Sequence, residues 1–312
     1  MPFPLNPEIA RLVALGAGPA VPEDFAEGDV RRLRGLLDDG LAQLAALPDV
    51  PDVSETSFVI DTPDGHRLPV RWYRKDGSTP GSAVLHFHGG AMVAGSVDLY
   101  GPLVRTYVAW TGVPMLAVDY RLAPEAPAGT AAEDGFSALR WLASHAEALG
   151  VEPSRIAVMG DSAGGGVAAA VAILARDRGV PLARQVLVYP MLDDRTTGPD
   201  PHLDASPLLF PHVFNRTAWS AVLGTSGRGG EGAGPGVVPA RNDDFGALAP
   251  AYIEVGELDI FRDEDVRYAL RLWQAGVSTE LHVVPGMPHA YDVLLLGEPR
   301  HQEGKIRVLR EL

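Results

Sequence analysis

Short apolar runs alternate along most of the chain with longer segments of helical periodicity. The apolar runs predict strands at Ser57–Ile60, Leu68–Arg74, Ala83–Phe87, Pro114–Val118, Arg155–Met159, Gln185–Tyr189, Ala251–Val255 and Thr279–Val284. The helical segments are Leu99–Trp110, Ala131–Leu149, Gly165–Arg176, Asp263–Ala275 and Ile306–Leu312. This alternation is typical of an α/β fold, in which helices cover both faces of a mostly parallel sheet. The first two strands, joined by a turn at Pro63-Asp64-Gly65, indicate an antiparallel start.

Two segments depart from the alternation. Residues 1–50 contain a helix with one apolar stripe, for which Asp29 is a plausible N-cap and Pro48 a plausible stop. The stripe consists of Leu33, Leu36, Leu37, Leu41 and Leu44. Residues 191–249 hold a helical patch at Phe214–Leu223 between stretches rich in glycine, proline and aspartate. An insertion of this length after a core strand is usually a lid or a binding loop. The pattern leaves open whether the first helix packs on the core or covers a pocket.

Composition restricts the possible chemistry. The 312 residues include no cysteine, which excludes disulfides, thiolate metal sites and a cysteine nucleophile. The formal net charge is −14, which argues against nucleic acid and anionic membranes as partners. The chain has no uninterrupted apolar span long enough to cross a bilayer, and its first residues lack a basic region. We therefore expect a cytoplasmic enzyme without integral membrane contact.

The segment Gly160-Asp161-Ser162-Ala163-Gly164 lies between an expected strand and an expected helix. A strand, G-x-S-x-G and a helix form the nucleophile elbow of α/β-hydrolases, in which a sharp turn exposes the serine hydroxyl. In a chain with 35 glycines, the pentapeptide alone could also be a glycine-rich turn. Its flanking elements favour the elbow, with Ser162 as the nucleophile and Asp161 in a supporting position.

A serine nucleophile needs a base and an acid, and α/β-hydrolases order them along the chain as serine, acid, histidine. His282, His289 and His301 follow a plausible acid. His282 lies within an apolar strand, and His301 lies in a charged segment. His289 follows the last strand, and loops beyond the carboxyl ends of parallel strands carry the chemistry of open sheets. We therefore predict His289 as the base.

Several carboxylates follow the strand Ala251–Val255 and are candidates for the acid. Asp259 lies at the apex of the loop and is the first choice. Asp263, which is also a candidate N-cap for the next helix, is second, and Glu257 is third.

The oxyanion hole should precede the nucleophile, in the loop after the third strand. His88-Gly89-Gly90-Ala91-Met92 occupies that position. Paired glycines allow backbone N–H groups to approach a developing negative charge. The predicted donors are Gly89, Gly90 and Ala163, and His88 is expected to hold the loop by hydrogen bonds.

Together with the block Asp119–Glu125, these motifs resemble the hormone-sensitive-lipase-like family of bacterial esterases, from about Ser82 to the end of the chain. The resemblance implies an eight-stranded sheet with one antiparallel strand. It implies a core of residues 51–190 and 250–312, with a cap built from residues 1–50 and 191–249. The implied activity is serine-dependent hydrolysis of short-chain carboxylic esters, with no metal or organic cofactor. Homodimerisation through the last strand and terminal helix is a further implication.

Ala91 departs from the family, which usually has glycine there, and we expect a local backbone adjustment with activity retained. The block Tyr120–Glu125 is expected to be structural, with Pro124 and Glu125 fixing a turn below the site. Plausible lining residues of the substrate pocket are Leu208, Leu209, Phe210, Phe214 and Trp219. Amides, lactones or carbamates are alternative substrates for the same groups. A ligand-binding protein on a retired hydrolase scaffold is disfavoured, because serine, acid and histidine are all present.

Overall fold

The computed structural model describes residues 3–15, 22, 24–198, 200, 202–203, 209–224 and 233–312. Within these residues an eight-stranded sheet has the order β1-β2-β4-β3-β5-β6-β7-β8. The strands are β1 (Val53–Asp61), β2 (Arg67–Lys75), β3 (Ala83–Phe87), β4 (Met115–Val118), β5 (Ile156–Asp161), β6 (Arg184–Val188), β7 (Ala251–Gly256) and β8 (Thr279–Val284). Strand β2 is antiparallel to β1 and β4, whereas the other paired strands are parallel. The predicted fold class and the antiparallel start are confirmed.

The described helices are α1 (Pro7–Ala14), α2 (Val30–Ala42), α3 (Val97–Thr111), α4 (Thr130–Ser144), α5 (Ala146–Leu149), α6 (Ala163–Asp177), α7 (His212–Leu223), α8 (Arg262–Gln274), α9 (Tyr291–Leu294) and α10 (Glu303–Arg310). Short 3₁₀ helices cover Gln43–Ala46, Pro153–Arg155, Pro239–Arg241 and Pro299–His301. Across the described part of the chain, no helix is long and apolar enough to cross a membrane.

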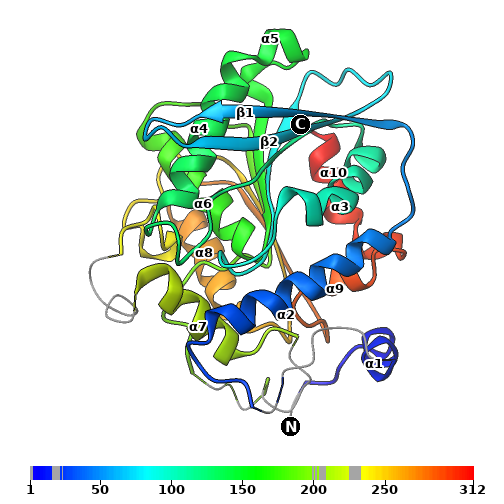
Figure 1. Ribbon diagram of the computed structural model, residues 1–312, viewed down its shortest axis with the longest axis vertical. Coiled ribbons are helices and arrows are strands. Elements are labelled where there is room, and N and C mark those ends of the chain that lie inside the picture. Colours follow the sequence, from blue (N-terminus) through cyan, green and yellow to red (C-terminus); the bar gives the residue numbers. More distant parts are fainter. Residues whose placement is uncertain are drawn as a thin grey trace.

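Helices cover both faces of the sheet, with α4 and α6 on one side and α3 and α10 on the other (Figure 1). Successive strand residues point to opposite faces, because the side-chain period of a strand is two. On β5, Val158 packs into one core cluster, whereas Ala157 and Met159 pack into the other. The central strands are buried on both faces, and this explains why their sequences are continuous apolar runs.

The prediction of one helix over 131–149 is wrong, because α4 ends at Ser144 and α5 begins at Ala146. The Ser144 hydroxyl donates to the carbonyl of Trp141 at 2.8 Å, and Nδ1 of the His145 ring lies 2.8 Å from the same carbonyl oxygen. Local polar groups thus compete for a helical acceptor and interrupt the helix. The terminal helix α10 also begins earlier than expected, at Glu303 rather than Ile306.

Helices α2 and α7 pack together at the end of the molecule where the parallel strands terminate (Figure 1). The carboxylate of Asp29 accepts the N–H of Arg32 at 3.0 Å, which confirms the predicted N-cap of α2. The helix ends at Ala42 and continues as a 3₁₀ helix to Ala46, so Pro48 lies beyond its end. Leu33 of α2 packs with Phe214 and other buried residues of α7.

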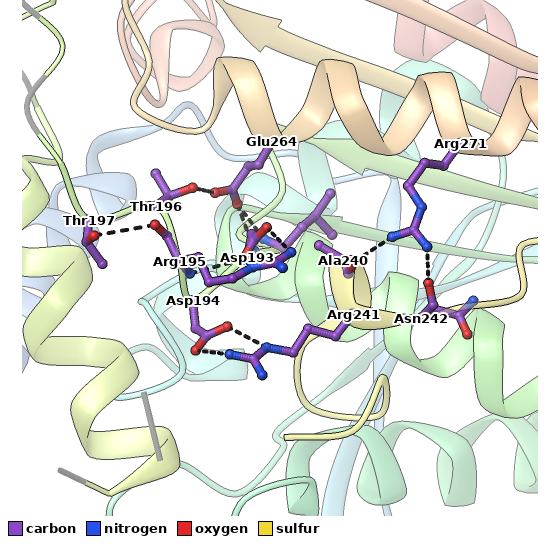
Figure 2. A network of polar contacts seen from close by, with 11 residues as sticks. Asp193, Asp194, Arg195, Thr196, Thr197, Ala240, Arg241, Asn242, Glu264 and Arg271 are labelled. Carbon is purple, nitrogen blue, oxygen red and sulfur yellow. Dashed lines mark hydrogen bonds and ion pairs between the residues drawn. The ribbon is translucent and has the colours of Figure 1, made fainter. Parts of the chain in front are cut away.

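A buried carboxylate on α8 holds the first residues after β6 (Figure 2). Oε1 of Glu264 accepts the N–H of Leu192 at 2.7 Å and that of Asp193 at 3.1 Å. Its Oε2 is hydrogen-bonded to the Thr196 hydroxyl. Burial raises the pKa of Glu264 well above its ordinary value. The start of the 191–249 segment is therefore fixed to the core by a carboxyl group that favours its neutral form.

Arginines hold the other end of the same segment (Figure 2). Arg241 makes two hydrogen bonds to the carboxylate of Asp194, at 2.9 and 2.8 Å. Arg271 of α8 donates to the carbonyl of Ala240 at 2.7 Å and also to the carbonyl of Asn242. Both ends of the insertion are thus attached close to one another on the core.

Candidate active site

Ser162 lies in a strained turn between β5 and α6, with φ +58° and ψ −120°. Its N–H donates to the carbonyl of Val188 at 2.9 Å, and its own carbonyl accepts the N–H of Met191 at 2.9 Å. A Cβ on Gly160 would lie 2.2 Å from the backbone of Gly164, so glycine is required at this position. The turn is therefore held by sterics and by hydrogen bonds to the strand β6 and the segment that follows it.

The loops after β5, β7 and β8 bring Ser162, Asp259 and His289 together. Nε2 of His289 lies 2.9 Å from the Ser162 hydroxyl oxygen, and Nδ1 lies 2.7 Å from Oδ2 of Asp259. Oδ1 of Asp259 accepts the N–H of Phe261 at 3.0 Å, which orients the carboxylate. All three side chains are buried, with 7%, 1% and 8% of Ser162, Asp259 and His289 exposed. This arrangement can transfer a proton from the hydroxyl to the imidazole.

The other candidate acids lie elsewhere. Asp263 is 55% exposed on α8 and pairs with Arg262 at 2.8 Å. The prediction that Asp263 caps α8 is wrong, because Phe261 occupies the N-cap and Asp259 binds the N–H of Phe261 instead. Oε2 of Glu257 accepts the N–H of Gly286 at 2.9 Å, and this contact braces the loop that leads to His289.

The other candidate histidines also lie outside this group. His282 is half-exposed on β8 and lies 2.6 Å from a carboxylate oxygen of Glu280. His301 lies 3.5 Å from a carboxylate oxygen of Glu8, near the N-terminal helix. Both residues contact glutamate side chains away from Ser162.

The loop after β3 borders the cavity beside Ser162 with the backbone of Gly89 and Gly90. A Cβ on Gly90 would lie 2.2 Å from the Ala94 carbonyl oxygen, and one on Gly89 would lie 2.5 Å from the Tyr100 hydroxyl oxygen. Ala163 is the first residue of α6, so its N–H has no acceptor within the helix. Ala91 has φ +57°, a left-handed conformation that disfavours a side chain.

The buried side chain of His88 holds this loop in place. Its Nδ1 lies 2.7 Å from the Gly89 carbonyl oxygen, and its ring stacks on Tyr120 with 4.3 Å between centroids. The Tyr120 hydroxyl donates to the carbonyl of His88 at 2.8 Å. Burial lowers the pKa of His88 to about 4, so the ring is neutral near neutral pH.

Glu125 lies in a turn over residues 123–125, where a structural turn was expected. Its carboxylate also accepts two hydrogen bonds from Arg34 of α2, at 2.8 and 2.7 Å. Arg34 also donates to the carbonyls of Val93 and Ala123, so one guanidinium joins α2 to the two loops at the carboxyl ends of β3 and β4. The Ala123–Pro124 peptide bond is cis.

A cavity of about 160 Å³ opens beside Ser162 and His289. Its lining residues come from α2, the β3 loop, α9 and the segment before α7: Leu36, Leu37, Gly40, Leu41, Gln43, Leu44, Gly89, Gly90, Ala91, Tyr100, Ser162, Tyr189, Leu209, Phe210, His289, Ala290, Val293 and Leu294. Leu209 and Phe210 are therefore lining residues, as the sequence indicated. Phe214 and Trp219 are fully buried in the packing between α2 and α7, and they do not line this cavity. Leu208 lies outside the described residues.

Sequence reasoning missed a buried ionic cluster behind His289. Lys305 of α10 is fully buried and donates to Glu254 and Asp292, each at 2.6 Å. Although burial opposes it, the two carboxylates raise the pKa of Lys305. Oδ1 of Asp292 accepts the Tyr189 hydroxyl at 2.6 Å. The sequence gives no sign of this role for Lys305, because a single lysine in an amphipathic helix is ordinary. Tyr189 directly follows the strand β6, and this position at the carboxyl end of a parallel strand could have identified it as a residue near the site.

Among the described residues no group of three or more histidine, aspartate or glutamate side chains is arranged to hold a metal ion. The groups gathered around Ser162 are a hydroxyl, an imidazole, a carboxylate and backbone amides.

Comparison with known proteins extends these observations. A family model described as the alpha/beta hydrolase fold matches residues 84–293. Ethyl acetate hydrolase from Pseudomonas putida is 35% identical over 99% of this chain and 98% of its own. Arylesterase from Saccharolobus solfataricus is 31% identical over 96% of this chain and 94% of its own. The solved structure of a bacterial heroin esterase superposes with a TM-score of 0.87 at 32% identity, covering 98% of this chain and 97% of that one. The chain belongs to the hormone-sensitive-lipase-like family of the α/β-hydrolases.

Proposed function

We propose that this protein is a serine carboxylesterase that hydrolyses short-chain acyl esters through an acyl-enzyme intermediate. The observation that carries the proposal is the continuous hydrogen-bonded series Ser162–His289–Asp259, with distances of 2.9 and 2.7 Å. It lies beside an apolar cavity at the carboxyl ends of the parallel strands, where α/β enzymes bind their ligands.

In the first half-reaction, the Ser162 oxygen attacks the ester carbonyl carbon as Nε2 of His289 takes the hydroxyl proton. Asp259 accepts the Nδ1–H of His289 and stabilises the imidazolium. The N–H groups of Gly89, Gly90 and Ala163 stabilise the oxyanion. When this tetrahedral intermediate collapses, the bond between the acyl carbon and the alcohol oxygen breaks, and His289 returns the proton to the departing alcohol.

In the second half-reaction, water replaces the alcohol. His289 takes a proton from the water as the water oxygen attacks the acyl carbon. The second tetrahedral intermediate collapses, the bond to Ser162 breaks, and the proton returns to the serine oxygen. The products are a carboxylic acid and the regenerated enzyme.

The surroundings of the site support an uncharged substrate. Leucine, valine and aromatic side chains dominate the cavity, and no charged side chain stands among its described lining residues apart from the titratable His289. An ester of a short carboxylic acid fits this chemistry. The names of the relatives, ethyl acetate hydrolase and arylesterase, support the same substrate class.

Active-site labelling and turnover test the proposal. A fluorophosphonate probe should label the wild type, and p-nitrophenyl butyrate should be hydrolysed. Ser162→Ala should abolish labelling and lower turnover by about four orders of magnitude or more. Ser154→Ala, at an exposed serine, is the control and should behave like the wild type. Turnover by Ser162→Ala at the wild-type rate would disprove the assignment, and selective hydrolysis of amides, lactones or carbamates would redirect it.

We also propose that residues 1–50 and 191–249 form a cap over a core of residues 51–190 and 250–312. Support comes from the packing of α2 against α7 and from the place of α2 and Phe210 in the cavity wall. Deletion of residues 1–50 tests this: the catalytic core should still react with the fluorophosphonate probe but lose discrimination among esters. Unchanged discrimination among esters in the shortened chain would contradict the proposal.

A homodimer formed through the β8 edge is a further proposal. β8 is the last strand in the sheet order, and Val283 on it is 38% exposed. Leu270 and Trp273 of the adjoining α8 are 48% and 45% exposed. Light scattering should give twice the monomer mass, and Val283→Asp should give a monomer. A wild type that elutes as a monomer at micromolar concentration would contradict the proposal.

We propose a cytoplasmic location as well. The cysteine-free composition supports it, because the fold needs no disulfides and hence no oxidising compartment. Esterase activity should appear in the cytoplasmic fraction of lysed cells, and its recovery outside the cytoplasm would contradict the proposal.

A further inference from the structure

One face of the helix α2 forms a wall of the cavity beside Ser162. The residues of α2 that line it recur at helical spacing, at about 100° per residue. They are Leu36, Leu37, Gly40 and Leu41, and Gln43 and Leu44 extend the same face into the 3₁₀ helix. Gly40 is therefore a position without a side chain in the middle of a row of leucines.

Space at Gly40 is open. A Cβ built there meets no atom within 4 Å, and the backbone has ordinary helical φ. Gly89 and Gly90 line the same cavity but differ, since a Cβ on either would lie within 2.5 Å of another atom. Neither close packing nor backbone conformation requires glycine at position 40, although glycine in a helix costs about 1 kcal/mol relative to alanine.

Other lining residues of the cavity are also apolar. Among them are Val293 and Leu294 of α9, and Leu209 and Phe210. A cavity lined in this way favours an unbranched hydrocarbon chain over a polar group.

We propose that Gly40 determines how long a chain of the substrate ester this cavity accepts. The proposal rests on the proposed esterase function and adds the residue that sets its chain-length range. Without a side chain at position 40, methylene groups of the substrate can pass between α2 and α9. A larger side chain at position 40 would occupy that space and exclude the distal methylenes.

The test compares Gly40→Leu and Gly40→Ala with Gly35→Leu and Gly35→Ala. Gly35 lies in the same helix, is exposed and does not line the cavity, and a Cβ on it would also meet no atom within 4 Å. The pairs therefore match in their effect on helix propensity and differ in the cavity. Values of kcat/KM are measured for p-nitrophenyl acetate, butyrate, hexanoate and octanoate. A second series uses acetates of ethanol, butanol, hexanol and octanol.

In Gly40→Leu, kcat/KM for the longer esters should fall relative to kcat/KM for the acetate. The loss should be about fourfold in kcat/KM for each methylene that no longer fits, so that octanoate is affected most. Gly40→Ala should show the same trend with a smaller shift, and both Gly35 variants should reproduce the wild-type profile. The series in which the loss appears identifies whether the acyl or the alcohol chain occupies the cavity.

An unchanged ratio of kcat/KM between long and short esters in both series for Gly40→Leu would overturn the inference. An equal shift in Gly35→Leu would also overturn it, because the effect would then come from the helix. Failure of the proposed function has a different signature: the wild type would hydrolyse none of the esters and would not react with a fluorophosphonate.

Discussion

The ring of Tyr189 packs edge-on against the imidazole of His289, with 4.7 Å between centroids and 63° between planes. The hydroxyl at the far end of Tyr189 donates to Asp292, three positions after His289. The tyrosine therefore contacts the proposed base and is itself anchored to the helix α9, which follows the His289 loop. The orientation of His289 depends on this contact as well as on Asp259.

Substitutions of Tyr189 should separate its ring from its hydroxyl. Tyr189→Phe keeps the ring and should lower kcat by no more than about threefold. Tyr189→Ala leaves a space beside the imidazole and should lower kcat by about 10- to 100-fold, since small misplacements of reacting groups are costly. Steady-state kinetics with p-nitrophenyl butyrate measures both. Equal loss in the two variants would assign the effect to the hydroxyl instead.

Removing the buried ammonium of Lys305 should destabilise the protein strongly. Lys305→Met leaves Glu254 and Asp292 buried without their cation and should lower the free energy of unfolding by about 3–5 kcal/mol. Arg307→Met, two positions later in α10, removes exposed ion pairs to Glu280 and Glu311 and should lower the free energy of unfolding much less. Urea denaturation compares them, and similar losses in the two variants would contradict the prediction.

The ion pair of Arg34 with Glu125 should hold α2 over the site. Arg34→Lys cannot make the two parallel hydrogen bonds, so KM should rise by about threefold to tenfold with a smaller change in kcat. Amide exchange in α2 should become faster. The exposed Arg31 provides the control, and Arg31→Lys should change neither quantity. A fall in kcat with unchanged KM would contradict the assignment.

The ion pair of Arg34 with Glu125 should persist to acidic pH. Hydrogen bonds from Arg34 lower the pKa of Glu125 from 4.5 to about 2. A carboxylate with a lowered pKa contributes its stabilisation above the ordinary value and loses it as the pH falls toward the lowered one. Amide exchange in α2, corrected for intrinsic rates, should therefore be slow at pH 5 and above and accelerate progressively as the pH falls from about 4.5 to 2. Acceleration already at pH 5 would indicate that the pair does not anchor the helix.

Neighbouring positions of the β3 loop should respond in opposite ways to exchange of glycine and alanine. Gly90→Ala places a methyl against the Ala94 carbonyl, displaces the loop and should lower turnover by about 100-fold or more. Ala91→Gly relieves a left-handed alanine and should keep turnover, with stability within about 1 kcal/mol of the wild type. Turnover and thermal unfolding measure both, and loss of activity in Ala91→Gly would show that the methyl itself is needed.

Glu264 should make stability fall as pH rises. Its raised pKa means that the folded state holds the proton more tightly than the unfolded state, so stability decreases above about pH 4.5. Glu264→Gln removes this pH dependence, because glutamine does not titrate. From pH 5 upward, the free energy of unfolding of the wild type should fall relative to that of the variant by at most about 1.4 kcal/mol per pH unit. Glu147→Gln, at an exposed position of α5, is the control. Parallel stability curves for wild type and Glu264→Gln would contradict the pKa direction.

Local physical constraints made much of the fold and the serine turn predictable. Strands that are buried on both faces are mostly apolar, so the strands β3 to β7 stand out as mainly apolar runs. The turn at Ser162 excludes side chains from positions 160 and 164, and both glycines lie within two residues of the serine, so the short motif is visible in the sequence. Chain order then restricted the acid and the base to the loops after β7 and β8.

The tertiary structure decided what depends on contacts between distant positions. Asp259, Asp263 and Glu257 are close in sequence and chemically alike, and only the packed loop shows which carboxylate meets His289. Arg34 meets Glu125 across 91 positions.

The place of Gly40 in the cavity wall likewise depends on tertiary packing, which brings α2 and α9 to one cavity. Periodicity determines which face of a helix is apolar. Which surface that face meets is determined by the balance of packing and hydrogen bonding across the whole chain, and no short segment contains it.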